Sequence, residues 1–278
     1  GGYDWFAGTS MAAPHVAGAA ALLIAAFPEM PQYPGAPGWS PGQETIKDRL
    51  LDSTEHRAAF VGKMQTEGRL NLYNALVGIY PPLIESFEAD TVYGEGSLTV
   101  TFSWDIRPRR AGTTVSATID FGDGTPPQSI GPSGAITHEY RSPGFYVASV
   151  HAGTAQGGDS YREIGILVND TASVLLIDDD GHREFSEVIA EALEAAGIAY
   201  ITVPSEYVEA GGLPPDVSNV LFWTAGITVQ PSLTTAEIDF LTAYLENGGR
   251  LFLTGRGILN DIAGTSFAHD FLGIGTVE

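Results

Sequence analysis

The chain of 278 residues has no cysteine, very little lysine and no apolar run long enough to cross a bilayer. The absence of cysteine excludes thiol catalysis, disulfide bonds and cysteine-ligated metal sites. The longest apolar stretch, residues 16–27, falls short of the roughly 20 residues that a transmembrane helix requires. The sequence therefore predicts no membrane span.

Basic residues are scarce, since 13 Lys and Arg face 34 Asp and Glu for a formal net charge of -21. A field of that sign repels nucleic acid and anionic membranes, so neither is an expected partner. The acidity fits either an exported protein kept soluble by its charge or a high-salt habitat. No secretory signal is visible, and we expect it to lie outside a sequence that starts with Gly inside a domain.

Composition and periodicity divide the chain into three predicted domains, at residues 1–80, 84–169 and 172–278. The first opens on a loop and a helix that is apolar on all sides, which is typical of a helix buried in a larger domain. A proline-rich loop and a second helix near residues 43–51 follow, and Pro81 and Pro82 mark the boundary.

The other two domains differ in their hydrophobic period. Apolar and polar residues alternate in residues 98–104 and 146–150, with Gly, Pro and Asp between such stretches, which predicts a small antiparallel β-sandwich. From residue 172 onward, short apolar strands alternate with helices, which predicts a three-layer α/β domain with a parallel sheet. The capping-box pattern Thr234 to Glu237 opens one of these helices.

A serine stands at the junction between the first loop and the first helix. Residues 8–18 read GTSMAAPHVAG, and backbone N–H groups at the start of a helix are unpaired, so Gly8, Thr9 and Ser10 lie where an oxyanion would be stabilised. The alternative is that Ser10 merely caps the helix.

The eleven-residue segment closely resembles the serine motif of subtilisin-like serine proteases, the subtilases. Residues 68–76, GRLNLYNAL, resemble the segment that closes the subtilase catalytic domain, so the likeness covers roughly the first 80 residues. The resemblance implies that Ser10 is the nucleophile of a Ser-His-Asp endopeptidase acting on proteins or peptides.

The remaining catalytic groups are not found in this sequence. His15 lies five residues after Ser10, about 7.5 Å along a helix and about 140° around it, so it cannot serve as the base. The subtilisin order is Asp, then His, then Ser, so we expect the Asp, the His and the oxyanion Asn to precede this segment. Without a base a serine is a weak nucleophile, and we expect the 278-residue chain alone to be inactive.

The second domain contains residues 119–124, IDFGDG, followed by His138, Glu139 and Tyr140 and by residues 144–147, GFYV. These resemble a polycystic-kidney-disease (PKD) domain, although Ile119 stands where Trp is frequent. The resemblance implies either adhesion to extracellular polymers or a rigid spacer, and both stay open. Calcium at Asp120 or Asp123 has little support.

The third domain resembles the amidotransferase-like α/β domain appended to some bacterial subtilases, on residues 175–181, LLIDDDG, and 244–255, YLENGGRLFLTG. Amidotransferase chemistry is not implied, because Arg256 stands near the place of the cysteine nucleophile. Asp178, Asp179 and Asp180 lie beyond a strand end and are candidate ligands of a hard cation. The favoured alternative is a solvated acidic loop with one Asp capping the next helix.

These patterns lead to three hypotheses. The first is a secreted, multidomain serine endopeptidase, extracellular or at the cell surface, that needs no cofactor for its chemistry. Structural calcium is common in such proteases, but the sequence does not locate a site. The second is a non-catalytic product that acts through the PKD-like and α/β domains, and the third makes the α/β domain a small-molecule or metal binder.

Overall fold

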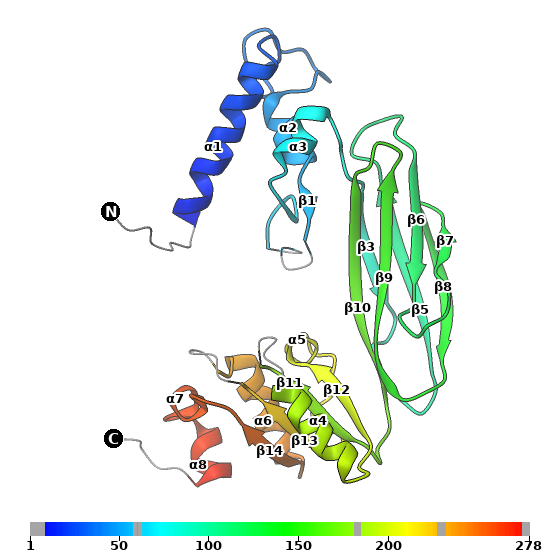
Figure 1. The fold of residues 1–278 in the computed structure, drawn as a ribbon, viewed down its shortest axis with the longest axis vertical. Helices are drawn as coiled ribbons and strands as arrows, with labels where there is room; N and C mark the ends of the chain where they lie inside the picture. Colours follow the sequence, from blue (N-terminus) through cyan, green and yellow to red (C-terminus); the bar gives the residue numbers. More distant parts are fainter. Residues whose placement is uncertain (1–8, 58–59, 61–62, 181–184, 227–231, 274–278) are drawn as a thin grey trace. The chain divides into compact units, whose positions relative to one another are not determined.

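A computed structural model describes residues 9–57, 60, 63–180, 185–226 and 232–273 (Figure 1). The chain forms two compact units, whose division runs through the β-sandwich. Unit 1 comprises residues 1–88, 102–136 and 149–163, and unit 2 comprises residues 89–101, 137–148 and 164–278. Within the described residues, no helix is long and apolar enough to cross a membrane.

The N-terminal part of unit 1 consists of three helices and a small two-stranded sheet. The helices are α1 (Thr9–Ala26), α2 (Ile46–Asp52) and α3 (Leu72–Val77), and the antiparallel strands are β1 (Glu55–His56) and β2 (Gly68–Arg69). A small core joins Leu23 of α1 to Ile46 of α2 and Ala75 of α3. Thr45 caps α2 in a capping box with Asp48, because each side chain accepts a bond from the other's backbone N–H.

The sandwich has a five-stranded sheet in the order β4-β10-β9-β6-β7 and a three-stranded sheet in the order β3-β5-β8. Its strands are β3 (Leu83–Ala89), β4 (Tyr93–Glu95), β5 (Leu98–Arg107), β6 (Val115–Asp120), β7 (Gln128–Ile130), β8 (Ser133–Tyr140), β9 (Gly144–Thr154) and β10 (Asp159–Asn169). A β-sandwich is what the alternating pattern predicts, with one difference. The short strand β4 pairs parallel to β10, so the sandwich is not purely antiparallel.

Apolar residues of alternating strand positions fill the sandwich core. Phe102 is fully buried and lies between Phe87 and Phe121, with both ring-centroid distances at 5.7 Å. Ile119, which replaces the frequent Trp, is also fully buried. Trp104 and Tyr140 are core residues, since 7% and 0% of their surfaces are exposed.

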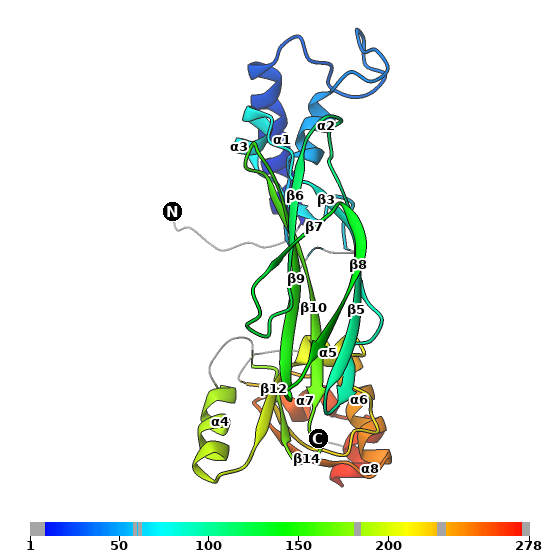
Figure 2. The same ribbon diagram turned by 90° about the vertical axis from the view of Figure 1, so that its right-hand side faces the viewer.

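The C-terminal part of unit 2 is a parallel sheet in the order β12-β11-β13-β14, flanked by helices. Its elements are β11 (Val174–Asp178), α4 (Phe185–Ala195), β12 (Tyr200–Pro204), α5 (Ser205–Glu209), β13 (Val220–Thr224), α6 (Thr235–Glu246), β14 (Arg250–Thr254), α7 (Ile258–Ile262) and α8 (Ser266–Leu272). Figure 2 shows α4 on one side of this sheet and α6 and α8 on the other. This is the layered α/β arrangement that alternating strands and helices predict.

Candidate functional site

Ser10 is the second residue of α1 and is exposed. The first N–H groups of an α-helix have no acceptor within the helix, so the backbone around Ser10 offers free donors and the positive end of the helix dipole. Thr9 begins the helix, and Gly8 lies outside the described residues. The assignment of Gly8, Thr9 and Ser10 to nucleophile and oxyanion support therefore stays a prediction.

Pro14 lies inside the first turns of α1 and changes the hydrogen bonding of the nucleophile's own backbone. Proline has no N–H, so Pro14 cannot donate the helical bond to the C=O of Ser10, four residues before it. The Ser10 carbonyl is thus left without its usual helical donor. The backbone around Ser10 therefore has both unpaired N–H groups and a C=O group without its helical partner. In a helix interior both kinds of group are paired.

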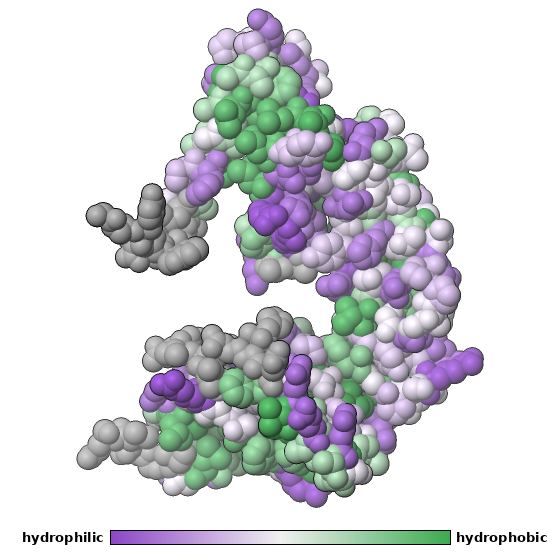
Figure 3. Space-filling model, in the orientation of Figure 1, coloured by the Kyte–Doolittle hydropathy of each residue, from purple (hydrophilic) through white to green (hydrophobic). Residues whose placement is uncertain are grey.

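The surface of α1 differs from the expectation of a buried helix. Among the α1 residues whose burial is described, only Ala19 and Leu23 are buried, whereas Val16, Leu22 and Ile24 have 46%, 54% and 38% of their surfaces exposed. The reason is that α2 and α3 cover a single stripe of a helix that is apolar on every side. Figure 3 shows the apolar surface that the C-terminal half of α1 presents.

Neither of the two histidines nearest in sequence has the placement of a base for Ser10. His15 and Ser10 lie on one continuous helix, so the separation in rise and rotation holds as predicted. His56 is buried in β1 and packs edge-on against Tyr161 of the sandwich, with ring centroids 5.4 Å apart. Burial lowers the pKa of His56, which favours the neutral ring.

The three carboxylates after β11 turn to different partners. Asp180 is buried, and its Oδ2 accepts bonds from the backbone N–H groups of Phe185 (2.7 Å) and Ser186 (3.1 Å), so it caps α4. Capping by one Asp is what the favoured alternative predicts, but the capping carboxylate itself is not solvated. Asp178 and Asp179 are half-buried.

Asp179 is bound on both of its oxygens, to the Trp223 indole N–H and the Ser205 hydroxyl, each at 3.1 Å. Burial raises the pKa of Asp179 to about 7, and it also raises the pKa of Asp178, with Asp180 adding repulsion. Within the described residues, no group of three or more His, Asp or Glu has the arrangement of a metal site. We therefore carry the cation hypothesis for Asp178, Asp179 and Asp180 no further.

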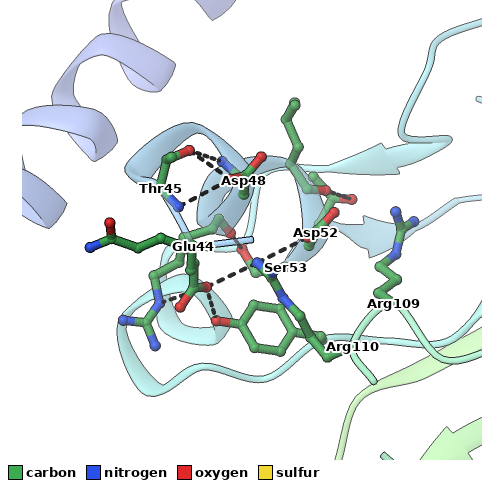
Figure 4. Close-up of polar contacts among 12 residues, drawn as sticks. Glu44, Thr45, Asp48, Asp52, Ser53, Arg109 and Arg110 are labelled. Atoms are coloured by element: carbon green, nitrogen blue, oxygen red, sulfur yellow. Dashed lines mark hydrogen bonds and ion pairs between the residues drawn. The ribbon is translucent and has the colours of Figure 1, made fainter. Parts of the chain in front are cut away.

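Two arginines after β5, Arg109 and Arg110, connect the sandwich to the helical part of unit 1 (Figure 4). One guanidinium nitrogen of Arg110 lies 3.0 Å from both Glu44 and Asp52, and its guanidinium stacks on the ring of Tyr80. Arg109 donates to the backbone carbonyls of Pro81 and Thr66. These contacts, which sequence reasoning missed, link residues 28 to 66 positions apart and fix the first domain on the sandwich.

Comparison with known families agrees with the patterns in the first two domains. The subtilase family model matches residues 1–76, and the PKD domain model matches residues 86–161. The predicted resemblance is confirmed. The subtilase match includes Ser10 in its motif and the closing segment at residues 68–76, and the PKD match includes the turn at residues 120–124.

Several solved structures are similar to part of this chain. The PKD1 domain of Vibrio anguillarum Epp is 22% identical and covers 32% of this chain and 94% of that chain, with a TM-score of 0.25. The PKD domain of the human receptor SorCS2 is 24% identical and covers 34% of this chain and 78% of that chain, with a TM-score of 0.26. No curated protein matches the chain. The amidotransferase-like resemblance of the α/β domain stays a prediction.

Proposed function

We propose that residues 1–76 supply the nucleophile segment of a serine endopeptidase that acts on proteins or peptides outside the cell. The observation that carries the proposal is the subtilase match over the segment in which Ser10 opens an exposed helix. Ser10 attacks the scissile carbonyl, and the unpaired N–H groups at the start of α1 stabilise the oxyanion. The attack needs no metal or organic cofactor.

The base, its Asp partner and the oxyanion side chain come from polypeptide outside residues 1–278 in this proposal. The exposed apolar sides of α1 support it, because a helix that is apolar all round is stable in water only when other elements cover it. The protein that performs the reaction is therefore larger than this chain. The 278-residue chain alone is expected to have no peptidase activity.

A fluorophosphonate probe tests this proposal, since it reacts only with an activated serine. We expect the protein expressed with its upstream coding sequence to be labelled and to cleave casein. Ser10→Ala should abolish both, whereas the matched change Ser40→Ala, at an exposed loop serine, should leave both intact. Labelling that survives Ser10→Ala, or peptidase turnover by the 278-residue chain that depends on Ser10, would overturn the proposal.

We propose that the PKD domain serves as a spacer more than as an adhesive surface. The Arg109 and Arg110 contacts support this, because half-buried ion pairs and a hydrogen bond to a backbone carbonyl hold the sandwich on the preceding domain instead of leaving a flexible linker. Binding of chitin or gelatin particles by the chain, lost when an exposed sandwich residue is changed, would favour the alternative of a non-catalytic adhesion protein.

A further inference from the structure

The α/β domain has a pocket at the edge of its sheet where open α/β folds bind ligands. In the strand order β12-β11-β13-β14, β12 lies on one side of β11 and the later strands lie on the other, so the topological switch point is between β11 and β13. The crevice beyond the carboxyl ends of the strands is the general ligand site of such sheets. A pocket of about 560 Å³ lies there. Its walls come from α4 and from the ends of β13 and β14 with the residues that follow them, and none of the lining residues that the structure describes is acidic.

Thr224, the last residue of β13, is among the residues that line this pocket, and its hydroxyl has no hydrogen-bond partner in the described part of the chain. The residue is 1% exposed, and no described residue forms a hydrogen bond with its Oγ1. A buried hydroxyl without a partner costs roughly 1–3 kcal/mol, so folded proteins rarely retain one without a reason. A polar group of a ligand in the pocket would supply the missing bond.

Arg256 provides the only charged side chain among the described residues that line the pocket. Its backbone N–H donates to the C=O of Gly226 at 2.8 Å, which fixes the turn after β14. Most arginines of this acidic chain form ion pairs, but Arg256 has none with any described residue. An unpaired cation in a protein of charge -21 is available to an anionic ligand.

The third feature of the pocket is its apolar wall. Phe185, Val188 and Ile189 of α4 line it, and Phe185 and Val188 have 39% and 64% of their surfaces exposed. A ligand that fills the pocket therefore needs an apolar group against α4 and an anionic group at Arg256. One guanidinium and one hydroxyl suit a planar monoanion, whereas a phosphate dianion would be repelled by a chain with so few cations.

We propose that this pocket binds a carboxylate that carries an apolar group, with Arg256 and Thr224 holding the carboxylate and α4 holding the apolar part. Two sources have this chemistry, a small free acid and the C-terminal residue of a peptide. The inference stands apart from the proteolytic function, because all of its residues belong to the α/β domain.

Isothermal titration of the 278-residue chain tests the proposal with N-acetyl-phenylalanine, its C-terminal amide, and a tetrapeptide ending in Phe with a free or amidated carboxyl group. We expect both acids to bind and both amides to bind at least about tenfold more weakly, since a charge-assisted hydrogen bond is lost. Tighter binding of the peptide acid identifies peptide ends as the source, and tighter binding of the small acid identifies free acids. Equal binding of acid and amide would refute the proposal, as would tighter binding of inorganic phosphate.

Three variants separate the site from general electrostatics and from folding. Arg256→Gln should weaken binding of the acid about tenfold or more, while Arg250→Gln, at the start of β14, should leave it unchanged. Thr224→Val should also weaken binding, yet it should keep or raise the melting temperature of the free chain, because it removes an unpaired buried hydroxyl. Equal effects of Arg256→Gln and Arg250→Gln, or full binding by Thr224→Val, would overturn the assignment.

Discussion

The sandwich is fixed to the domain before it and to the domain after it by different kinds of interaction. In unit 1 the contacts are ionic, with Arg110 between Glu44 and Asp52 and Arg162 paired to Glu67. In unit 2 they are amide and aromatic. Asn169 donates to Asn219, and the Tyr207 hydroxyl donates to the C=O of Val92 at 2.6 Å.

The difference shows how an acidic chain uses its few cations. Of the 13 basic residues, Arg110 and Arg162 lie where carboxylates of the first domain approach the sandwich, whereas neutral groups serve at the boundary with the α/β domain. Half-buried charges respond to pH and to the loss of a partner, whereas neutral amides respond only to the loss of their bonds. The following predictions test this contrast, beginning with the largest effect.

Asn219→Leu should have the largest effect on stability, and it tests the neutral hydrogen bonds of unit 2. Asn219 is buried, and its side-chain N–H groups donate to the carbonyls of Asp170 (2.7 Å) and Ser173 (2.8 Å). Leucine removes both of these bonds and the bond that the Asn169 amide donates to Asn219, all of them in a buried setting, so we expect unit 2 to lose about 3 kcal/mol or more. Hydrogen exchange of the unit 2 amides measures this loss. The exposed Asn260→Leu is the matched control, and an equal loss there would contradict the prediction.

Arg110→Met tests the ionic side and should cost unit 1 about 2–3 kcal/mol. The change leaves Glu44 and Asp52 close together, half-buried and without their shared cation. Arg141→Met removes a cation from a pair with 80% and 46% side-chain exposure and should cost less than about 0.5 kcal/mol. Urea unfolding of both variants gives the comparison. Similar losses in the two would show that the ionic contacts do not fix the first domain on the sandwich.

These contacts also mark the limit of what the sequence predicts. The capping box at Thr234 and Glu237 was predictable because four consecutive residues determine it, and the structure confirms it. The pairing of Arg110 with Glu44 spans 66 positions and has no local pattern. The role of Ser10 was inferred from a motif, whereas the unpaired Thr224 hydroxyl depends on packing around β13 that no sequence pattern reports.

Asp179→Asn should stabilise unit 2 at pH 8 by roughly 1–3 kcal/mol. A tenfold change in proton affinity corresponds to about 1.4 kcal/mol, and solvent around the half-buried carboxylate reduces the effect of the pKa shift. Burial raises the folded-state pKa of Asp179 from 3.8 to about 7, so the folded chain binds a proton that the unfolded chain releases. The loss of unfolding free energy caused by the ionised Asp179 carboxylate is complete above pH 7 and disappears as the pH falls toward 4. Urea unfolding of native and variant chains across this range measures the difference. The exposed Asp216→Asn should differ from the native chain by less than about 0.5 kcal/mol throughout.

His56→Phe should show the opposite dependence on pH in unit 1, with a smaller effect of roughly 1 kcal/mol at neutral pH. Both ring nitrogens of His56 are buried without a hydrogen bond to a described residue, and phenylalanine keeps the contact with Tyr161. Burial lowers the folded-state pKa of His56 below 6.5, so the unfolded chain binds the extra proton and the native unit loses stability as the pH falls through 6.5. The advantage of the variant should therefore grow on acidification, whereas that of Asp179→Asn shrinks. If the gain in unfolding free energy from His56→Phe stayed constant from pH 8 to pH 5, His56 would titrate alike in the folded and unfolded chains. The stability of the two units would then not respond to pH with opposite signs.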